Sequence, residues 1–453
     1  MKQIGLLKAI MLTSKYGKMS ASERDKLREA RLKDLVAYAK ANSPYYKKVY
    51  EGTSDEFKLS ELPVTNKRDM MEHFDLWTTD RDIRLADIAK FMENPDNIGR
   101  KFRGKYYVFT TSGSTGHPSV VLCDKTTNSI MGAVSILRSI ARPEDMRKLM
   151  KRGFKTVGVF ATGGFYLGNS SVRSILLKMP WKKHRMMVTS VLHPLPGIVE
   201  ELNEFQPAML GGYPTALELL IDEQMSGRLH ISPALIMTGG EYLSDSLRKQ
   251  LQETFGCYVQ TNYSCTEGGT VAYECGHQHF HINDDWLIVE AVDKDNNPVP
   301  EGVQSDKLLL TNLFNFTQPL IRFEITDRVI MHHELCPCKN PSPWLEIEGR
   351  TDDILTFMSK DKQVKVPPLA LYAILKEVHE LKQFQLVKRD GNILLLRMEC
   401  GGSDRQIAFE KARAAVNRYL HESGINEVLW ELSDEMPRRN EKSGKFNHIY
   451  VER

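Results

Sequence analysis

The sequence predicts an α/β protein with a large layered α/β domain, to which a β region is added, and a small C-terminal α+β domain. Three observations support this prediction. Strand-like and helix-like patterns alternate from Tyr106 onward, strand-like runs dominate after Gly276, and a smaller mixed unit follows residue 350. A chain of 453 residues has room for two or three domains. We therefore expect one domain over residues 1–350 and a second over residues 351–453.

The first hundred residues are expected to be helical. Residues 20–40 place Leu32, Leu35 and Ala39 at helical spacing among many charges, which is typical of an amphipathic helix. Ser43 should end this helix, because a residue that precedes proline avoids the helical conformation.

The next part of the chain is expected to form parallel strands connected by helices. Ala234–Thr238 is typical of a buried strand, Ser244–Phe255 of a helix with Ser244 as its N-cap, and Cys257–Tyr263 of the following strand. A strand, a helix and a strand at this spacing predict parallel pairing. Earlier strand-like runs are Tyr106–Thr110, Ser119–Leu122 and Lys155–Ala161.

The β region is expected to be antiparallel, with a turn at Asp293–Asn297. Its predicted strands are Trp286–Val292, Lys307–Asn312, Leu320–Thr326 and Val329–His332.

The small domain is expected to combine two helices with a sheet, and a hairpin should turn at Asp390 and Gly391. Its predicted helices are Leu369–His379 and Asp404–His421, and its predicted strands besides the hairpin are Ile354–Phe357 and Glu427–Leu432.

Composition and charge are those of an ordinary soluble globular protein. Apolar residues make up 41% of the chain and charged residues 26%, and the net charge is only +3. This balance predicts neither a nucleic acid nor a membrane as the partner. No apolar run is long enough for a transmembrane helix, and the first residues lack the features of a signal peptide. The expected location is cytoplasmic, and the seven cysteines are too few for a disulfide scaffold.

A loop of glycines and hydroxyl residues lies between two predicted strands, over residues 110–118. Glycines let backbone N–H groups approach an anion, and Ser and Thr hydroxyls add donors without bulk. The loop lacks the Gly-Lys-Ser/Thr ending of a Walker motif. A polar connecting loop is the alternative, although the length of the tract favours phosphate binding.

Two further motifs follow neighbouring predicted strands. Thr238-Gly239-Gly240-Glu241 comes first, and residues 262–269, which include Tyr263, Thr266 and Glu267, come one strand later. In parallel sheets, ligands bind beyond the carboxyl ends of the strands. A tyrosine ring can stack on a base, while Thr and Glu can hold phosphate and Mg²⁺. Taken singly, each motif is also explained by a helix cap, a core tyrosine or a solvated glutamate.

In this order, the motifs resemble those of the adenylate-forming superfamily of acyl- and aryl-CoA ligases, above all phenylacetate–CoA ligases and the related capsule-biosynthesis proteins. The resemblance covers nearly the whole chain. Besides the motifs above, it rests on residues 35–46, 62–67, 211–217, 319–327, 348–353 and 443–446.

This resemblance implies a set of ATP-binding residues. Those that would surround the β- and γ-phosphates of ATP are Ser112, Gly113, Ser114, Thr115 and Gly116. Those that would flank the adenine are Gly239, Gly240, Glu241 and Tyr263.

The resemblance also implies catalytic roles. Thr266 would contact the α-phosphate, and Glu267 would help to hold Mg²⁺. Asp327 would bind the ribose hydroxyls, with Arg350 close by. Lys445 would neutralise charge as the carboxylate attacks the α-phosphate.

The same family pattern implies that the small domain is mobile and rotates about Asp352 between two half-reactions. Two positions depart from the pattern. His117 stands where the family usually carries lysine, and Ser264 replaces a glycine. A second lysine, Lys442, lies near Lys445, but Lys445 directly follows Gly444, as in the family pattern.

Cysteines and histidines suggest a structural zinc site. Cys275, Cys336 and Cys338 supply three thiols, and three thiolates with one imidazole make a closed tetrahedral zinc site. Some members of the resembling subfamily carry a similar arrangement. His281 best fits that pattern as the fourth ligand, while His277 and His279 stay open as alternatives.

The expected activity is ATP- and Mg²⁺-dependent adenylation of a small-molecule carboxylic acid, followed by transfer of the acyl group to CoA. CoA enters by analogy with the family. Phe160, Phe165, Tyr166 and Tyr213 would form an apolar acid-binding pocket, or they are ordinary core residues. The alternatives are transfer to an amine or hydroxyl in surface-polysaccharide synthesis, and a non-catalytic scaffold. The oligomeric state, including a homodimer, stays open.

Overall fold

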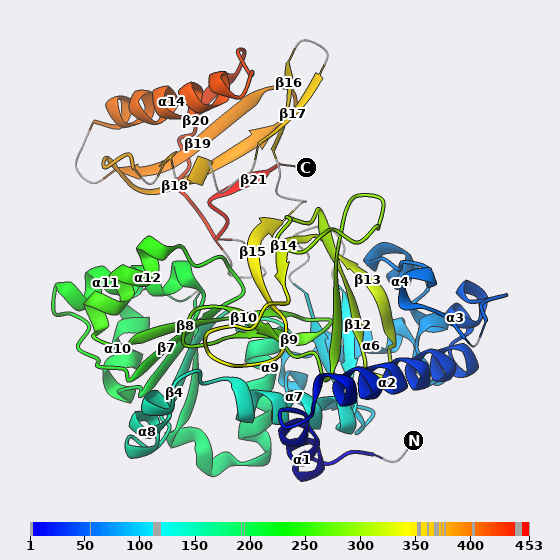
Figure 1. The fold of residues 1–453 in the computed structure, drawn as a ribbon. Helices are drawn as coiled ribbons and strands as arrows, with labels where there is room; N and C mark the ends of the chain where they lie inside the picture. The colour runs from blue at the N-terminus through cyan, green and yellow to red at the C-terminus, as the bar shows by residue number, and fades with distance from the viewer. Residues whose placement is uncertain are drawn as a thin grey trace. The chain divides into compact units, whose positions relative to one another are not determined.

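The computed structural model describes residues 3–452, apart from residues 55, 112–118, 192, 194, 351–354, 360–361, 367–370, 373, 376, 401–403 and 440–445. The described chain divides into two compact units (Figure 1). The first contains Met1–Ile325 and Val329–Ile347, and the second contains Thr326–Arg328 and Glu348–Glu441. The mixture of helices and sheets confirms the predicted α/β class.

The amino-terminal part of the first unit is helical, as predicted. Ser20 begins the longest of these helices with a reciprocal capping box, in which its side chain and that of Glu23 each accept from the other residue's backbone N–H. This helix ends at Asn42, and Pro44 occupies the first turn of the next. The helices are α1 (Leu6–Tyr16), α2 (Ala21–Asn42), α3 (Pro44–Val49), α4 (Lys67–Glu72), α5 (Phe74–Trp77) and α6 (Leu85–Met92), with short 3-10 turns η1 (Leu59–Glu61) and η2 (Pro95–Asn97).

A nine-stranded sheet forms the centre of the first unit, in the order β14-β15-β10-β9-β8-β7-β6-β4-β5. Strands β5, β4, β6, β7 and β8 pair in parallel, and β8, β9 and β10 continue the sheet antiparallel. The strands are β4 (Thr156–Phe160), β5 (Met186–Ser190), β6 (Met209–Gly212), β7 (Leu235–Gly239), β8 (Tyr258–Cys265), β9 (Gly269–Glu274), β10 (Phe280–Ile282), β14 (Asp327–His332) and β15 (Trp344–Arg350).

Helices connect the parallel strands, and the predicted strand–helix–strand unit is confirmed. Helix α12 joins β7 to β8, and Ser244 caps it by accepting from the N–H of Leu247. Gly256 ends it in the left-handed conformation (φ 63°), which glycine adopts without a Cβ clash. The helices of this region are α7 (Lys125–Arg138), α8 (Pro143–Lys151), α9 (Leu167–Lys178), α10 (Leu195–Phe205), α11 (Pro214–Met225) and α12 (Asp245–Phe255), with the 3-10 turn η3 (Pro180–His184).

Two three-stranded antiparallel sheets complete the first unit. One consists of β1 (Lys101–Phe102), β2 (Tyr106–Thr110) and β3 (Val120–Cys123), and the other of β11 (Leu287–Val292), β12 (Lys307–Asn312) and β13 (Leu320–Ile325). The predicted fourth strand of the β region exists as β14, but it joins β15 in the large sheet. The residue pattern predicts that a strand forms, whereas its partner depends on which exposed edge it meets.

The second unit has a four-stranded sheet in the order β20-β19-β18-β21 and a separate hairpin. The predicted turn joins β18 to β19, and Gly391 adopts a positive φ of 68° there. The hairpin is β16 (Leu355–Ser359) and β17 (Lys362–Val366), and the other elements are β18 (Leu381–Arg389), β19 (Ile393–Cys400), α14 (Arg405–Glu422), β20 (Leu429–Leu432) and β21 (Ile449–Val451).

Within the described residues, the predicted helix over 369–379 ends earlier than expected. Residues 371–372 and 374–375 are helical, whereas residues 377, 379 and 380 are turn residues. The N–H groups of Glu377 and Val378 bond to carbonyls three residues back, which tightens the chain and ends the helix. No helix in the described part of the chain is long and apolar enough to cross a membrane.

A buried ion pair fastens α7 to the loop between β10 and β11. Arg138 donates to both carboxylate oxygens of Asp285, at 2.8 Å each, and to Asn283 at 2.7 Å. The Asp285 side chain is 1% exposed, so its charge depends on this pairing. Arg31 from α2 adds a hydrogen bond to the Asp285 carbonyl and stacks on Trp286.

We expect Arg138→Met to lower the free energy of unfolding by about 3 to 5 kcal/mol, because it leaves a buried carboxylate without its partner. Burial already raises the pKa of Asp285, and Arg138 opposes this rise. Without the guanidinium, the pKa of Asp285 in the folded protein rises further above its value in the unfolded chain. Between these two pKa values the folded protein holds a proton that the unfolded chain has lost, so the stability of the variant falls as pH rises through this range. Urea unfolding near pH 5 and pH 8 should show the smaller loss near pH 5. Equal losses at both values would contradict a charged Asp285.

Candidate functional site

The candidate nucleotide residues follow two adjacent parallel strands, at their carboxyl ends. Gly239 is the last residue of β7 and pairs with Asn262 on β8. Gly240 follows with φ 80°, a conformation that residues with a Cβ rarely adopt. Tyr263 lies on β8 and is 7% exposed, and Thr266 follows the strand in the turn to β9. Both predicted motifs therefore lie at one edge of the sheet, where ligands of parallel sheets bind.

The Glu241 carboxylate caps helix α11. Its Oε2 accepts from the backbone N–H of Thr215 at 3.2 Å and from the Thr215 hydroxyl at 2.7 Å. Tyr213, the N-cap residue, supplies no side-chain cap, so Glu241 satisfies a free N–H of the first turn from another loop. The family resemblance implies that Glu241 lies beside adenine. In the structure its carboxylate connects the loop after β7, which carries Glu241, to helix α11.

Hydrogen bonds hold together the two described residues that flank the glycine- and hydroxyl-rich segment. The Thr111 N–H donates to the Ser119 carbonyl at 3.1 Å, and the Ser119 N–H donates to the Thr111 hydroxyl at 2.7 Å. Lys67 donates to the same hydroxyl at 3.2 Å, and the Ser119 hydroxyl donates to Glu267 at 3.0 Å. A cation and a carboxylate thus contact the base of the segment predicted to bind phosphate.

Lys67 is a candidate site residue that the motifs did not predict. It begins α4, whose N-cap is Asn66, and Thr65 is fixed by backbone hydrogen bonds to β13. The available signal was its place in the run 62–67, which is part of the family resemblance but by itself names no ligand. Only the fold brings this lysine to Thr111.

Ser264, which departs from the family pattern, has a local structural role. Its hydroxyl donates to the Thr270 hydroxyl at 3.3 Å across the β8–β9 hairpin. Cys265 accepts from the N–H of Gly268 at 3.2 Å within the turn that carries Thr266 and Glu267. These two bonds fix the hairpin end on which the candidate catalytic residues stand.

Several predicted residues lie outside the described part of the structure. Asp327 is described as the first residue of β14, and Arg350 as the last residue of β15, with its side chain outside the description. The predicted residues that lie wholly outside the described part are Ser112, Gly113, Ser114, Thr115, Gly116, His117, Asp352, Lys442 and Lys445. Their assignments stay predictions.

The predicted acid-pocket aromatics divide between two hydrophobic clusters. Phe160 and Tyr213 meet edge to face, with ring centroids 5.6 Å apart, and Tyr166 packs against the same cluster. Gly158 leaves room for the Phe160 ring, since a Cβ there would come within 2.4 Å of it. Phe165 instead packs in the cluster of the helical region, 5.9 Å from Phe91. The structure therefore brings together three of the four rings.

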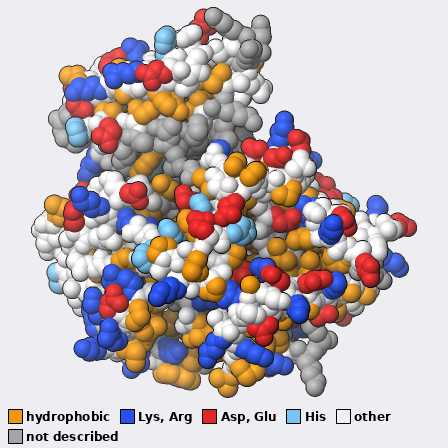
Figure 2. All heavy atoms as spheres, viewed as in Figure 1, with side chains coloured by type: hydrophobic (Ala, Val, Ile, Leu, Met, Phe, Trp, Pro, Cys, Tyr) orange, Lys and Arg blue, Asp and Glu red, His pale blue; other side chains and the backbone are white. Residues whose placement is uncertain are grey.

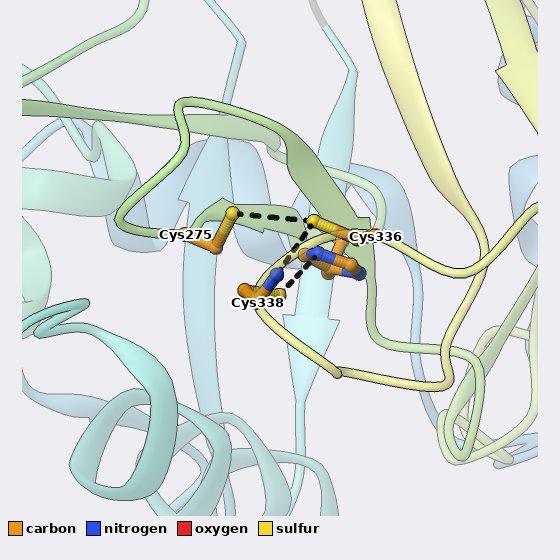
Figure 3. A group of neighbouring side chains, drawn as sticks. Cys275, Cys336 and Cys338 are labelled. Carbon is orange, nitrogen blue, oxygen red and sulfur yellow. Dashed lines mark hydrogen bonds between the residues drawn. The ribbon is translucent and has the colours of Figure 1, made fainter.

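A second candidate site is a cluster of Cys275, His281, Cys336 and Cys338, whose ligand atoms lie within 4.8 Å of one another. These are the four residues that the sequence predicts as zinc ligands. Figure 3 shows the three cysteine side chains converging from two loops. Cys275 follows β9, His281 stands on β10, and the other two lie between β14 and β15.

The spacing within this cluster fits a tetrahedral metal ion. Two sulfurs at about 2.3 Å from a tetrahedral zinc lie about 3.8 Å apart, and the Sγ atoms of Cys275 and Cys336 are 3.8 Å apart. Cys338 Sγ lies 3.2 Å from His281 Nε2. The opposite ring nitrogen, Nδ1, is 2.9 Å from the carbonyl of Ser342, which can only accept, so Nδ1 carries the hydrogen. Nε2 is then free of hydrogen and available as a ligand.

Backbone N–H groups complete the environment of the three sulfurs. Cys275, Cys336 and Cys338 each accept from the N–H of the residue two positions later, at 3.4, 3.5 and 3.4 Å respectively. Gln278 and Lys339, each three residues after a cysteine, have φ of 65°. The two loops therefore fold into similar turns that aim N–H dipoles at the sulfurs, which favours thiolates.

The alternative histidines occupy other positions. His279 stacks on Trp344, with centroids 3.9 Å apart, and its Nδ1 lies 3.3 Å from Cys336 Sγ. His279 therefore contacts the sulfur of Cys336 but is not one of the four clustered residues. Burial and the neighbouring thiols raise the pKa of Cys338 to about 12, so a thiolate at Cys338 requires a nearby cation.

Comparisons with known proteins show what the chain as a whole resembles. No family model matches the chain. A phenylacetate–coenzyme A ligase of Thermus thermophilus is 27% identical over 82% of this chain and 80% of its own length. Protein CapK of Staphylococcus aureus is 24% identical over 92% of this chain and 91% of its own.

A solved structure shares the fold. A 2-hydroxyisobutyryl-CoA ligase in complex with R3-HIB-AMP matches 96% of this chain and 91% of its own, with a TM-score of 0.65 and 19% identity. The resemblance recognised in the sequence is thereby confirmed: the chain is similar in sequence to phenylacetate–CoA ligases and to CapK, and it shares its fold with a 2-hydroxyisobutyryl-CoA ligase.

Proposed function

We propose that this protein is an AMP-forming acid–thiol ligase, which activates a carboxylic acid as its acyl-adenylate and transfers the acyl group to CoA. The observation that carries the proposal is the relationship to phenylacetate–CoA ligase over 82% of the chain. The placement of Gly239–Glu241 and Tyr263–Glu267 at one carboxyl edge of the sheet supports it. In this proposal, residues 1–350 bind ATP and the acid, and residues 351–453 form a lid that turns about Asp352.

The described residues support particular roles in the first half-reaction. Glu267, held by Ser119, would help to bind Mg²⁺, which neutralises phosphate charge when bound. Lys67, at Thr111, adds a positive charge at the base of the phosphate-binding loop. Gly239 and Gly240, which have no side chains, would leave space for adenine beside Tyr263. Lys445 would stabilise the negative charge that develops as the acid's carboxylate attacks the α-phosphate and pyrophosphate leaves.

The acid is proposed to lie beside Phe160 and Tyr213, which suit an aryl or acyl group. The Glu241–Thr215 bonds join the loop after the adenine residues to the helix that follows Tyr213. Changes at this joint should therefore affect the KM for the acid as well as for ATP.

We also propose that the four-residue cluster binds a structural zinc ion. Its support is the donor set of three sulfurs and one imidazole, the 3.8 Å sulfur–sulfur distance and the N–H groups aimed at each sulfur. Four protein ligands leave no open position, so the ion would supply stability rather than catalysis. The seven cysteines, all within the described residues, form no disulfide, and a cytoplasmic location remains part of the proposal.

Pyrophosphate release with ATP and Mg²⁺, measured across aryl and fatty acids with and without CoA, tests the function. We expect one acid class to give release and CoA to increase turnover. Release that ignores CoA would favour the alternative, transfer to an amine or hydroxyl. The relationship to CapK over 92% of the chain keeps this acceptor worth testing. No release with any acid would contradict the proposed ligase.

A further inference from the structure

Residues 146–199 contain no aspartate or glutamate. The same 54 residues hold ten lysines and arginines, while the rest of the chain has 51 of these against 58 acidic residues. The small overall charge of +3 therefore conceals one strongly basic segment inside an otherwise acidic protein. A basic surface of this kind attracts anionic partners, which the charge of the whole chain does not reveal.

The fold gathers two parts of this segment at one edge of the large sheet. Residues 147–155 precede β4 and residues 177–185 precede β5, and these two strands are parallel neighbours. The Thr156 N–H donates to the Arg185 carbonyl at 2.8 Å, which joins the two parts directly. We call residues 147–155 and 177–185 together the basic edge. It lies at the amino ends of the strands, whereas the candidate nucleotide residues follow their carboxyl ends.

The basic edge also exposes large apolar side chains. Trp181 is 66% exposed, Met150 63%, Leu177 47% and Phe154 40%. Figure 2 shows lysine and arginine side chains gathered over α8 at the lower left of the molecule, with hydrophobic ones beside them. Exposed apolar side chains are unfavourable in water. Four of them among cations therefore indicate a surface that binds another molecule or a membrane.

Most charges of the basic edge are not neutralised within the protein. Lys148 lies 3.7 Å from Asp145, and Arg152 is bound to backbone carbonyls. Within the described residues, Lys182, Lys183 and Arg185 form no ion pair with a carboxylate. These three follow Trp181 within four positions and are available to an external anion.

We propose that the basic edge binds the surface of an anionic lipid bilayer. Tryptophan and other amphipathic side chains favour the boundary between headgroups and acyl chains, and lysines beside them meet the anionic headgroups. Stable attachment requires both a polybasic and an apolar contribution, and the basic edge provides both. A nucleic acid would use the cations but would leave Met150 and Leu177 in water. Attachment by the amino ends of the strands keeps the candidate nucleotide residues on the opposite edge of the sheet.

Vesicle flotation tests this proposal without ATP or substrate. The full-length protein should float with vesicles of phosphatidylcholine and phosphatidylglycerol and not with phosphatidylcholine alone. Lys182→Glu with Lys183→Glu should weaken binding at least about tenfold, because each lysine near an anionic surface contributes on the order of a fivefold gain. Lys47→Glu with Lys48→Glu on α3 is the matched control, since these two lysines are likewise adjacent in sequence, are exposed and lie outside the basic edge.

Trp181→Ala separates the apolar contribution from the ionic one, and its loss of binding should persist at high salt. No flotation with anionic vesicles at low salt would overturn the proposal, as would equal loss in the α3 control. Binding to RNA that competes fully with vesicles and ignores Trp181→Ala would instead assign the edge to nucleic acid. Pyrophosphate release should remain in all these variants, so failure here is distinct from failure of the proposed ligase activity.

Discussion

Cys336→Ser is expected to remove zinc from the protein and to lower its stability sharply. Cys336 is 2% exposed and contacts Cys275 in the cluster and His279 beside it, so no solvent molecule can easily replace its sulfur. Zinc binding contributes on the order of 10 kcal/mol to the folding of small zinc-binding peptides, and a missing thiolate removes much of that affinity. We expect a loss of several kcal/mol, measured by thermal unfolding, together with less than one zinc per chain by elemental analysis.

The stability loss must be separated from the effect of placing a hydroxyl in the core. Cys123→Ser is the matched control, because Cys123 is also 2% exposed but lies outside the cluster. It should retain zinc and lose less stability. A chelator should lower the Tm of the unchanged protein toward that of the Cys336 variant and leave that variant itself unaffected. A Cys336→Ser protein with one zinc per chain would rule out the proposed site.

Lys445→Ala is expected to reduce adenylate formation by about 10² to 10³-fold, the usual effect of removing one group that stabilises transition-state charge. Lys445 lies outside the described residues, so this prediction rests on its position after Gly444 in the family pattern. ATP should still bind. Transfer to CoA from a preformed adenylate should largely survive, because that step does not involve attack on the α-phosphate.

Two measurements distinguish this role from a structural one. Pyrophosphate release reports the first half-reaction, and thioester formation from added acyl-adenylate reports the second. Lys442→Ala is the matched control, three residues earlier, and should change neither rate strongly. Equal loss of both half-reactions in Lys445→Ala would contradict the assignment, and a loss confined to Lys442→Ala would transfer the role to that residue.

Local patterns predicted most of the elements, since they depend on neighbouring residues. The strand at Tyr106–Thr110 and the helix capped by Ser244 lie where the sequence places them. Strand partners were harder, because pairing is decided by residues distant in sequence. For this reason β14 was expected in the antiparallel region but joins the large sheet.

The sequence by itself determined which residue types are available for the sites. The cysteine cluster is the clearest example, because thiols and imidazoles have few other uses together, and the family pattern favoured His281 over its neighbours. The motifs after β7 and β8 were likewise recognisable, since glycines and hydroxyls at strand ends carry a local signal.

The tertiary structure decided how those residues are used, because the contacts that define their roles join segments far apart in the chain. Lys67 reaches Thr111 across 44 positions, and Glu241 caps α11 26 positions away. The basic edge exists only because β4 and β5 pair in parallel, which aligns the residues that precede them. The chemistry of each side chain follows from the local sequence, whereas the contacts that decide its role follow from tertiary packing.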